Sequence, residues 1–330
     1  MSIETLIDKD FSGVVFVKEA EHTIFEKAFG YADLYNSIPN EIGTKFAAAS
    51  GGKAFLATGI LKLIEEGRLS FDDCIGDILY MDLQSIDPQI TIHQLLNHTS
   101  GIPDYFDETV MEEYEELWKD YPNYKIRTSS DIVPLFINKP MMYPKGKKFQ
   151  YNNTGYVVLG LIIEKILVCH FDKYLEDAIF KPCNMLNTGY YELDRLPAKC
   201  ANSYIYDKEK KEFYTNIYSV DVKGTGAGGV FTTALDIEAF WKNLLNGKII
   251  SKKMVSKMIE PQVKEQCYGY GIWLKKGESN TFIPYFQGSD PGVSFYSSFD
   301  IEKNMCIVLM SNFADNVWKI NREIIKELDK

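Results

Sequence analysis

Patterns typical of β-strands gather at the two ends of this chain of 330 residues, and this distribution constrains its fold most. Near the N-terminus, residues 13–17 and 23–30 are short β-prone runs joined by a polar connection, which predicts an antiparallel hairpin. Four more strands at hairpin spacing are expected near the C-terminus, at residues 268–274, 281–286, 293–299 and 305–310. A terminal helix is expected over residues 317–328.

Between these ends the pattern becomes helical. Apolar residues recur at helical spacing from Phe55 to Ile64, and Gly67 is a stop signal. We therefore infer an α+β sandwich in which an antiparallel sheet from both chain ends is flanked by helices, with a mainly helical region inserted between them. The chain would form a single unit, with a sheet subdomain at approximately 1–65 and 225–330, a helical subdomain at approximately 66–224, and a cleft where they meet.

The charge balance argues against two classes of partner. The 46 Asp and Glu against 36 Lys and Arg give a formal charge of -10, which repels phosphate backbones and anionic lipid heads. The longest apolar run, residues 156–163, is far shorter than the roughly 20 residues that cross a bilayer. We expect no nucleic-acid partner and no transmembrane segment.

The N-terminus carries acidic residues early and lacks a basic region followed by an apolar stretch, so it does not resemble a secretory signal. We expect a cytoplasmic location for the chain as given, or an extracytoplasmic one if a signal segment has been removed from it.

Cysteine and histidine spacing argues against a metal site. The six cysteines are scattered without a C-x-x-C pair, and we expect reduced, mostly buried thiols. His93 and His98 lie five residues apart, on different sides of a helix, so they are not expected to share a metal. His98 is better explained as a buried, hydrogen-bonded residue than as a catalytic one, because no acid, His and Ser order is evident.

Ser50 and Lys53 are the first candidate catalytic pair. Three residues advance a helix by most of one turn, so the amine can reach the hydroxyl. Serine needs a base because its hydroxyl is barely ionised at neutral pH, and lysine becomes a base when its surroundings disfavour the charged form. Taken alone, the spacing is better explained by a solvated lysine at a helix start.

Tyr151 and Asn153 form a second candidate pair. A phenol can shuttle a proton between nucleophile and leaving group if cations lower its pKa, and an amide can orient both the amine and the substrate carbonyl. Taken alone, this segment also fits a turn with a packed aromatic residue.

The joint pattern is more specific than either pair. Six motifs occur in the order seen in the serine β-lactamase family, at residues 46–55, 69–73, 90–101, 151–156, 227–229 and 268–271. The chain resembles the branch that includes class C β-lactamases, D-Ala-D-Ala carboxypeptidases, and related esterases and D-amino-acid peptidases. The resemblance covers nearly the whole length. It implies a β-lactamase/transpeptidase-like fold, with Ser50 as nucleophile, Lys53 as its base partner, and Tyr151 and Asn153 as the second catalytic element.

The third element of that family, Lys-Thr-Gly or His-x-Gly on a strand beside the nucleophile, is altered here. Counted back from Pro291, it falls on Phe286, Gln287 and Gly288, so neither Lys nor His is present. We expect these three residues to contact substrate, with the phenyl ring offering apolar surface that disfavours carboxylates. The backbone N–H of Ser289 would join that of Ser50 in an oxyanion hole.

Two other motifs have weaker support. Residues 224–229 match G-x-G-x-x-G, but no strand–helix unit of the dinucleotide-binding kind surrounds them. Residues 48–52 approximate the nucleophile elbow of α/β-hydrolases, but the parallel βα units and late histidine of that fold are missing.

These features predict a serine hydrolase that acts through an acyl-enzyme on an ester, amide, peptide or β-lactam. An esterase or peptidase is favoured over an efficient β-lactamase, and no metal or organic cofactor is required. The alternative is a catalytically weak protein that keeps the fold and binds a penicillin or a peptide in the cleft. The altered third element favours this alternative, whereas the retained Ser50, Lys53, Tyr151 and Asn153 oppose it.

Overall fold

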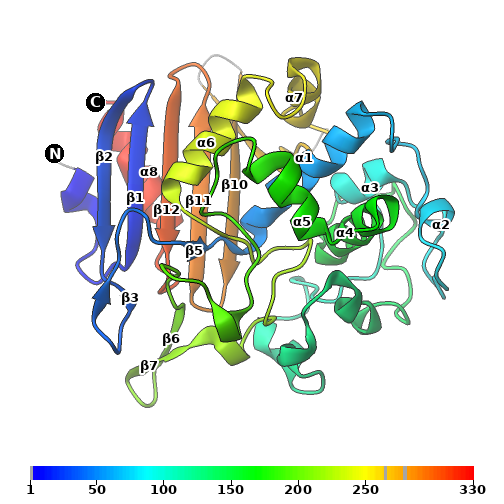
Figure 1. The fold of residues 1–330 in the computed structure, drawn as a ribbon, viewed down its shortest axis with the longest axis horizontal. Coiled ribbons are helices and arrows are strands. Elements are labelled where there is room, and N and C mark those ends of the chain that lie inside the picture. The colour runs from blue at the N-terminus through cyan, green and yellow to red at the C-terminus, as the bar shows by residue number, and fades with distance from the viewer. Residues whose placement is uncertain (1–2, 264–265, 278–280) are drawn as a thin grey trace.

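The computed structural model describes residues 3–263, 266–277 and 281–330. Within them the largest sheet has six strands in the order β2-β1-β12-β11-β10-β9, and each neighbouring pair is antiparallel (Figure 1). Its strands are β1 Gly13–Glu19, β2 His22–Phe29, β9 Trp273–Lys276, β10 Phe282–Asp290, β11 Val293–Asp300 and β12 Met305–Ser311. Because β1 pairs with β12, the two chain ends share one sheet, which confirms the prediction.

Each face of this sheet is covered. On one face, the amphipathic helix α8 (Val317–Leu328) and the 3-10 turn Ile3–Leu6 bury an apolar cluster that includes Val15, Leu309 and Ile320. On the other face lie α1 (Gly52–Glu65) and α6 (Ala234–Leu245), packed into a larger core shared with the helical region. The sheet is therefore the middle layer of an α+β sandwich.

The inserted region is helical and irregular, as predicted. Its helices are α2 Ile75–Ile78, α3 Ile92–Leu96, α4 Asn153–Leu167 and α5 Phe171–Leu175, with a π-helical turn at Glu176–Phe180. Further 3-10 turns lie at Tyr114–Trp118, Asn123–Lys125, Ser129–Leu135, Leu193–Arg195 and Asn216–Tyr218. The hairpin of β6 (Tyr204–Asp207) and β7 (Glu212–Thr215) within this region was not predicted.

Short elements complete the chain. They are β3 Tyr31–Asp33, β4 Ile38–Pro39, β5 Phe46–Ala47, β8 Phe231–Thr232 and α7 Lys252–Met258. The pairing of β5 with β8 brings the segment before Ser50 beside the glycine-rich segment 224–229. This small sheet therefore links two sequence motifs that are far apart in the chain.

Helix α1 forms as predicted and ends just before Gly67, but it does not bury a single stripe. Nearly every residue from Gly52 to Leu63 is buried, because the sheet, α4 and α5 surround it. A helix so enclosed can hold a polar side chain at its N-terminal end out of bulk water.

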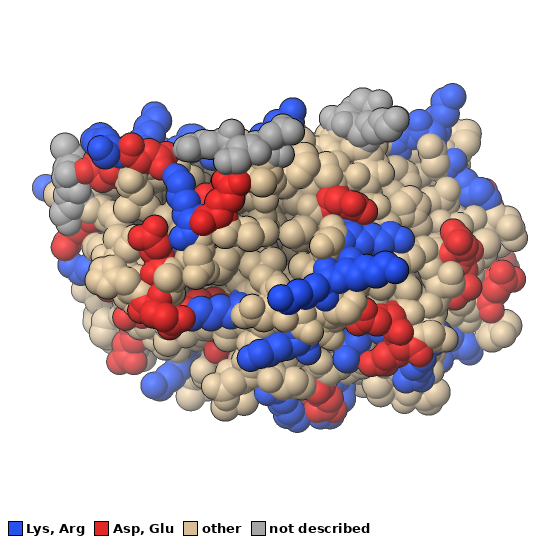
Figure 2. Space-filling model, turned by 90° about the horizontal axis from the view of Figure 1, so that it is seen from above, with Lys and Arg blue, Asp and Glu red and all other residues tan. Residues whose placement is uncertain are grey.

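Charged residues of both signs are intermixed on the face seen from above (Figure 2). Among the described residues, no single helix is long and apolar enough to cross a membrane. Asn153–Leu167 and Phe171–Phe180 meet that criterion only as a pair, bent by 78°.

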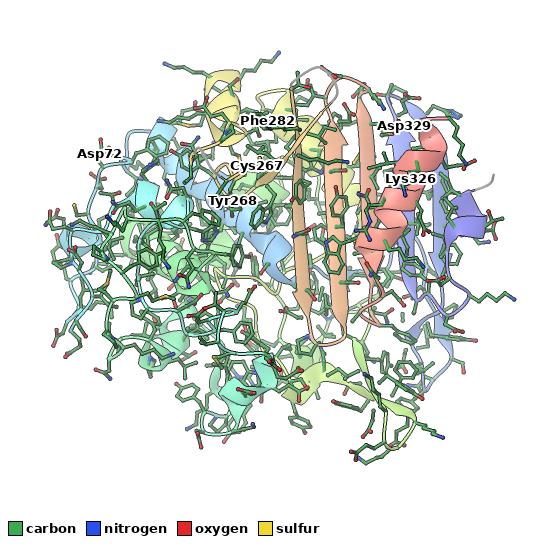
Figure 3. The ribbon with its side chains drawn as sticks, turned by 180° about the vertical axis from the view of Figure 1, so that it is seen from behind. Asp72, Cys267, Tyr268, Phe282, Lys326 and Asp329 are labelled. Atoms are coloured by element: carbon green, nitrogen blue, oxygen red, sulfur yellow. The ribbon has the colours of Figure 1, made fainter. Side chains whose placement is uncertain are left out.

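The prediction of a strand over residues 268–274 was wrong in its first half. Strand β9 begins at Trp273, and Gly271 takes a positive φ of 71° that a regular strand excludes. Tyr268 instead lies between the sheet edge and the helical region (Figure 3), with its hydroxyl 3.0 Å from Nε2 of His98.

The cysteine prediction was also partly wrong. All six thiols are free, but Cys183 and Cys306 are buried whereas Cys169 and Cys267 are exposed. The sequence contains no C-x-x-C pair, but it carries no information on how deeply each thiol is buried.

Candidate active site

A cavity of about 1070 Å³ lies where the sheet meets the helical region. Ser50, Tyr151, Asn153 and Ser289 all line it, so the structure brings together residues from three distant parts of the sequence. The predicted cleft is therefore confirmed, although the boundaries of the two subdomains stay a prediction.

Ser50 lies in the 3-10 turn Ala49–Gly51 that leads into α1. The preceding residue, Ala49, adopts a left-handed φ of 45°, a conformation that non-glycine residues rarely take. The carbonyl of Ala49 accepts a hydrogen bond from the Gly229 N–H at 3.1 Å, and the Ala48 N–H donates to the Val230 carbonyl at 2.8 Å. The segment around 229 therefore holds the strained turn that presents Ser50 to the cavity.

Lys53 lies beneath Ser50 and is only 2% exposed. Its ammonium donates to Oγ of Ser50 at 2.9 Å, to Oδ1 of Asn153 at 2.9 Å and to the carbonyl of Ala227 at 2.5 Å. Burial lowers the pKa of Lys53 to about 8, although nearby carboxylates, led by that of Glu108, partly oppose this shift. The alternative of a solvated lysine is therefore wrong.

These three contacts determine where a proton can move. The amide oxygen of Asn153 and the carbonyl of Ala227 can only accept hydrogen bonds, whereas the hydroxyl of Ser50 can also donate. If Lys53 loses a proton, its amine can still donate to Asn153 and Ala227 while its lone pair accepts from Ser50. The site can thus place a neutral amine directly against the serine proton.

Asn153 is held at the first turn of α4. Its backbone N–H donates to Asp104 at 2.8 Å, and the same carboxylate accepts from the N–H of Thr154 at 3.0 Å. Its side-chain Nδ2 lies 3.3 Å from the carbonyl of Phe106 and 3.5 Å from Glu108, which orients Oδ1 toward Lys53. Asp104, which sequence reasoning missed, therefore anchors the amide that contacts Lys53.

Tyr151 lies beside the pair, with Nζ of Lys53 5.0 Å from the centre of its ring. Burial raises the pKa of Tyr151 well above its usual value, although a hydrogen bond with Ser50 partly opposes this. The condition set for a proton shuttle, a pKa lowered by cations, is therefore not met in this state. The phenol is neutral, and it can relay a proton only by donating one as it accepts another.

His98 is buried, as expected. Its Nδ1 accepts from the Asn152 N–H at 3.1 Å, so Nε2 carries the hydrogen and donates to Tyr268. Burial and the neighbouring Lys53 lower the pKa of His98 well below its usual value. His93 instead contacts Tyr270 and Asn97, and the described residues contain no group of three His, Cys, Asp or Glu that could hold a metal ion.

Strand β10 passes directly behind the nucleophile. A Cβ at Gly288 would lie 2.3 Å from the carbonyl oxygen of Ala48 and 2.7 Å from the amide nitrogen of Ser50, so only glycine allows this approach. The next residue, Ser289, lines the cavity beside the Ser50 amide, where the oxyanion hole was predicted. Its role in binding an oxyanion stays a prediction.

The prediction for the Phe286 side chain was wrong. The ring is 2% exposed, does not line the cavity, and packs against Phe55, Phe240 and Trp241. Alternation along the strand directs it to the core face, where α1 and α6 cover it. Gln287 does line the cavity, and its Oε1 accepts from Nε1 of Trp318 at 2.7 Å.

The sequence analysis also missed an acidic lining. The described residues that line the cavity include no Lys, Arg or His, but they include six carboxylates, namely Glu108, Glu112, Glu113, Glu115, Asp221 and Asp290. The acidic stretch at 107–116 was a visible signal in the sequence. Asp221 and Asp290 carried no such signal, because only the fold brings them to the cavity.

A family model described as Beta-lactamase matches residues 4–329. The chain belongs to the beta-lactamase family. Among solved structures, it is similar to a penicillin binding protein from Bacillus halodurans, with 37% identity, a TM-score of 0.93, and coverage of 98% of this chain and 99% of that one. Among curated proteins, it is 29% identical to penicillin-binding protein 4* of Bacillus subtilis, over 94% of this chain and 70% of that protein.

A second similarity concerns the fold alone. The D-amino acid amidase of Ochrobactrum anthropi SV3 superposes with a TM-score of 0.77 at 24% identity, covering 94% of this chain and 90% of that one. A protein with a different name therefore has the same fold as this chain.

Proposed function

We propose that this protein is a serine hydrolase that forms an acyl-enzyme on Ser50. The observation that carries the proposal is the triple contact of buried Lys53 with Ser50, Asn153 and Ala227. This arrangement supports a lysine base because burial depresses its pKa and its hydrogen bonds direct its lone pair toward the serine proton.

In the proposed acylation step, Oγ of Ser50 attacks the carbonyl carbon while its proton moves to Nζ of Lys53. The carbonyl oxygen becomes an oxyanion between the N–H groups of Ser50 and Ser289. The carbon–heteroatom bond then breaks, and the leaving alcohol or amine takes the proton from Lys53 through the hydroxyl of Tyr151.

Deacylation reverses these roles. A water molecule attacks the acyl-enzyme and gives up its proton through Tyr151 to Lys53. The carboxylic acid leaves when the bond to Oγ breaks, and the proton returns to Ser50. In both steps the proton is carried by Lys53 and Tyr151, and water is the only reactant added to the substrate.

The proposed substrate is an ester or amide, with β-lactams turned over poorly. A penicillin carries a carboxylate, and the described lining offers no cationic side chain to pair with it. The acidic side chains of the lining instead disfavour an anion in the cavity, with Asp290 contributing little charge near neutral pH because burial raises its pKa to about 8. The relatives named as a penicillin-binding protein and an amidase are compatible with either substrate class, so the acidic lining is what favours the ester or amide.

The test uses p-nitrophenyl acetate, which is small and neutral, together with a fluorophosphonate probe and intact-mass analysis. We expect hydrolysis and a single adduct, both lost in Ser50→Ala. Ser256→Ala, at an exposed site on α7, is the matched control and should keep both. Undiminished activity in Ser50→Ala would reject the nucleophile, and an adduct that forms without turnover would favour the alternative of a binding protein.

A further inference from the structure

His98 holds the segment that carries Tyr151 at two points. Its side chain is buried, and its backbone takes a left-handed φ of 59°, which histidine adopts more readily than most residues. Its carbonyl accepts a hydrogen bond from the Gln150 N–H at 3.0 Å, and its Nδ1 accepts from the Asn152 N–H at 3.1 Å. One residue therefore fixes the backbone on both sides of Tyr151.

The imidazole of His98 also packs against the phenol itself. The centre of its ring lies 4.5 Å from that of Tyr151 and 5.1 Å from that of Tyr156. The ammonium of Lys53 lies near the same two rings, 5.0 and 5.7 Å from their centres. Because His98 and Lys53 share these neighbours, a shift of the imidazole would move the phenol relative to the amine.

The partners of His98 determine which ring nitrogen carries the hydrogen. Nδ1 accepts from a backbone N–H, so Nε2 is protonated and donates to the hydroxyl of Tyr268 at 3.0 Å. Burial and the nearby ammonium of Lys53 lower the pKa of His98 well below its usual value. The ring is therefore neutral, with its one in-plane lone pair directed at the Asn152 N–H.

We propose that His98 is a positioning residue for Tyr151, and that the lone pair on its Nδ1 holds the phenol where it can exchange a proton with Lys53. This inference rests on the proposed function, because it assigns a role in the same proton transfer. His98 does not line the cavity, so it acts through the segment 150–152 and not on the substrate.

Loss of the Nδ1 acceptor would disturb this segment. Asn152 is buried, and its N–H would have no partner unless the backbone moved to find one. A displacement of about 1 Å at reacting groups can slow a reaction about a hundredfold. We therefore expect the effect on catalysis to exceed the effect of losing the other contacts of the ring.

Two substitutions separate the two nitrogens of His98. Asn has an amide oxygen at the position of Nδ1 and tolerates a positive φ, so His98→Asn keeps the acceptor for Asn152 and loses the bond to Tyr268. Gln has its amide group near the position of Nε2 and no acceptor at the δ position, so His98→Gln does the reverse. With p-nitrophenyl acetate, we expect kcat/KM to fall about tenfold or more in His98→Gln and less than about threefold in His98→Asn. A smaller loss in His98→Gln than in His98→Asn would overturn the proposal.

A Tyr151→Phe background distinguishes positioning of the phenol from general damage to the fold. If His98 acts through the phenol hydroxyl, His98→Gln should cost less than about threefold once that hydroxyl is absent. An equal loss in both backgrounds would overturn the positioning role. His93→Gln is the matched control, since that ring bonds to Tyr270 and Asn97 instead, and it should leave kcat/KM nearly unchanged.

A measurement on the unaltered protein gives an answer even if a variant does not fold. In NMR spectra of the imidazole nitrogens, His98 should carry a hydrogen on Nε2 and none on Nδ1 from about pH 5 to 8, the range in which an ordinary histidine changes charge. A hydrogen on Nδ1 would overturn the positioning role while ester hydrolysis and probe labelling still supported the Ser50 mechanism. Absence of hydrolysis and of labelling would instead reject the proposed function, and this role with it.

Discussion

The two walls of the cavity differ in how their polar groups are satisfied. Around Lys53, each hydrogen of the ammonium has an acceptor in the chain, and Asn153 is anchored in turn by Asp104. On the side lined by Asp290, that carboxyl group has no such partner among the described residues. The lysine side is therefore organised by the chain alone, whereas Asp290 lines the cavity without a hydrogen-bond partner among the described residues.

Removing the proton-handling groups should give the largest effect. Lys53→Ala and Tyr151→Phe are each expected to reduce kcat/KM for a neutral ester about a hundredfold or more, the usual scale for acid–base groups. Because both residues handle one proton, the double variant should lose little further activity. Steady-state kinetics of the four proteins checks this, and strictly multiplicative losses would show that the two residues serve separate steps.

The pH dependence should be the next largest effect. Lys53 acts as a base only when neutral and has a pKa of about 8, so kcat/KM for a neutral ester should rise with pH and level off above that value. Between pH 6 and 8 the rise should be roughly fiftyfold if one group controls it. An activity that falls across this range would contradict a lysine base.

Two variants sharpen this prediction in opposite directions. Asn153→Asp places a carboxylate beside the ammonium and should move the midpoint to higher pH. Glu108→Gln removes the carboxylate that most raises the pKa of Lys53 and should move the midpoint to lower pH. A midpoint that moves in neither variant would show that Lys53 does not control the pH dependence.

Phe286→His tests whether a side chain at this position of strand β10 can reach the cavity. Phe286→His should destabilise the fold by about 2 kcal/mol, roughly thirtyfold in the folding equilibrium, because the imidazole would enter an aromatic cluster without a partner. Urea unfolding measures this, with Phe286→Leu as the apolar control. The ratio of nitrocefin to ester hydrolysis should not change, and a shift toward nitrocefin would mean that the new side chain reaches the cavity.

The sequence predicted the main sheet well because the patterns that indicate its strands and turns lie within short stretches of the chain. The N-terminal hairpin, three of the four C-terminal strands and helix Val317–Leu328 follow from alternation, helical spacing and turn residues within short windows. Hairpin β6–β7 was missed because its alternating aromatic residues flank a charged connection, and the surrounding region appeared helical. The segment before Trp273 was misassigned because the conformation of Gly271 depends on tertiary packing.

The catalytic candidates were predictable as residue types, but their surroundings were not. The spacing of Ser50 and Lys53 predicts proximity, whereas the contact with the Ala227 carbonyl requires a segment about 170 residues away to return to the site. Counting back from Pro291 correctly predicted that Gly288 and Ser289 line the cavity, but it did not reveal that Phe286 faces the core. The direction of a side chain on a strand depends on register, and which face is covered depends on the fold.

Substitution of Gln287 should give the smallest effect. It tests the face of β10 opposite Phe286. Its Oε1 accepts from the indole of Trp318 on α8, so Gln287→Leu should leave that N–H to solvent and cost about 1 kcal/mol of stability. For a neutral ester we expect less than a threefold change in kcat/KM, because this contact fixes α8 against the sheet and not the reacting atoms. Gln287→Glu keeps the acceptor and is the matched control in thermal unfolding. A tenfold rise in KM in Gln287→Leu with unchanged stability would show instead that the amide binds substrate, as the sequence analysis predicted.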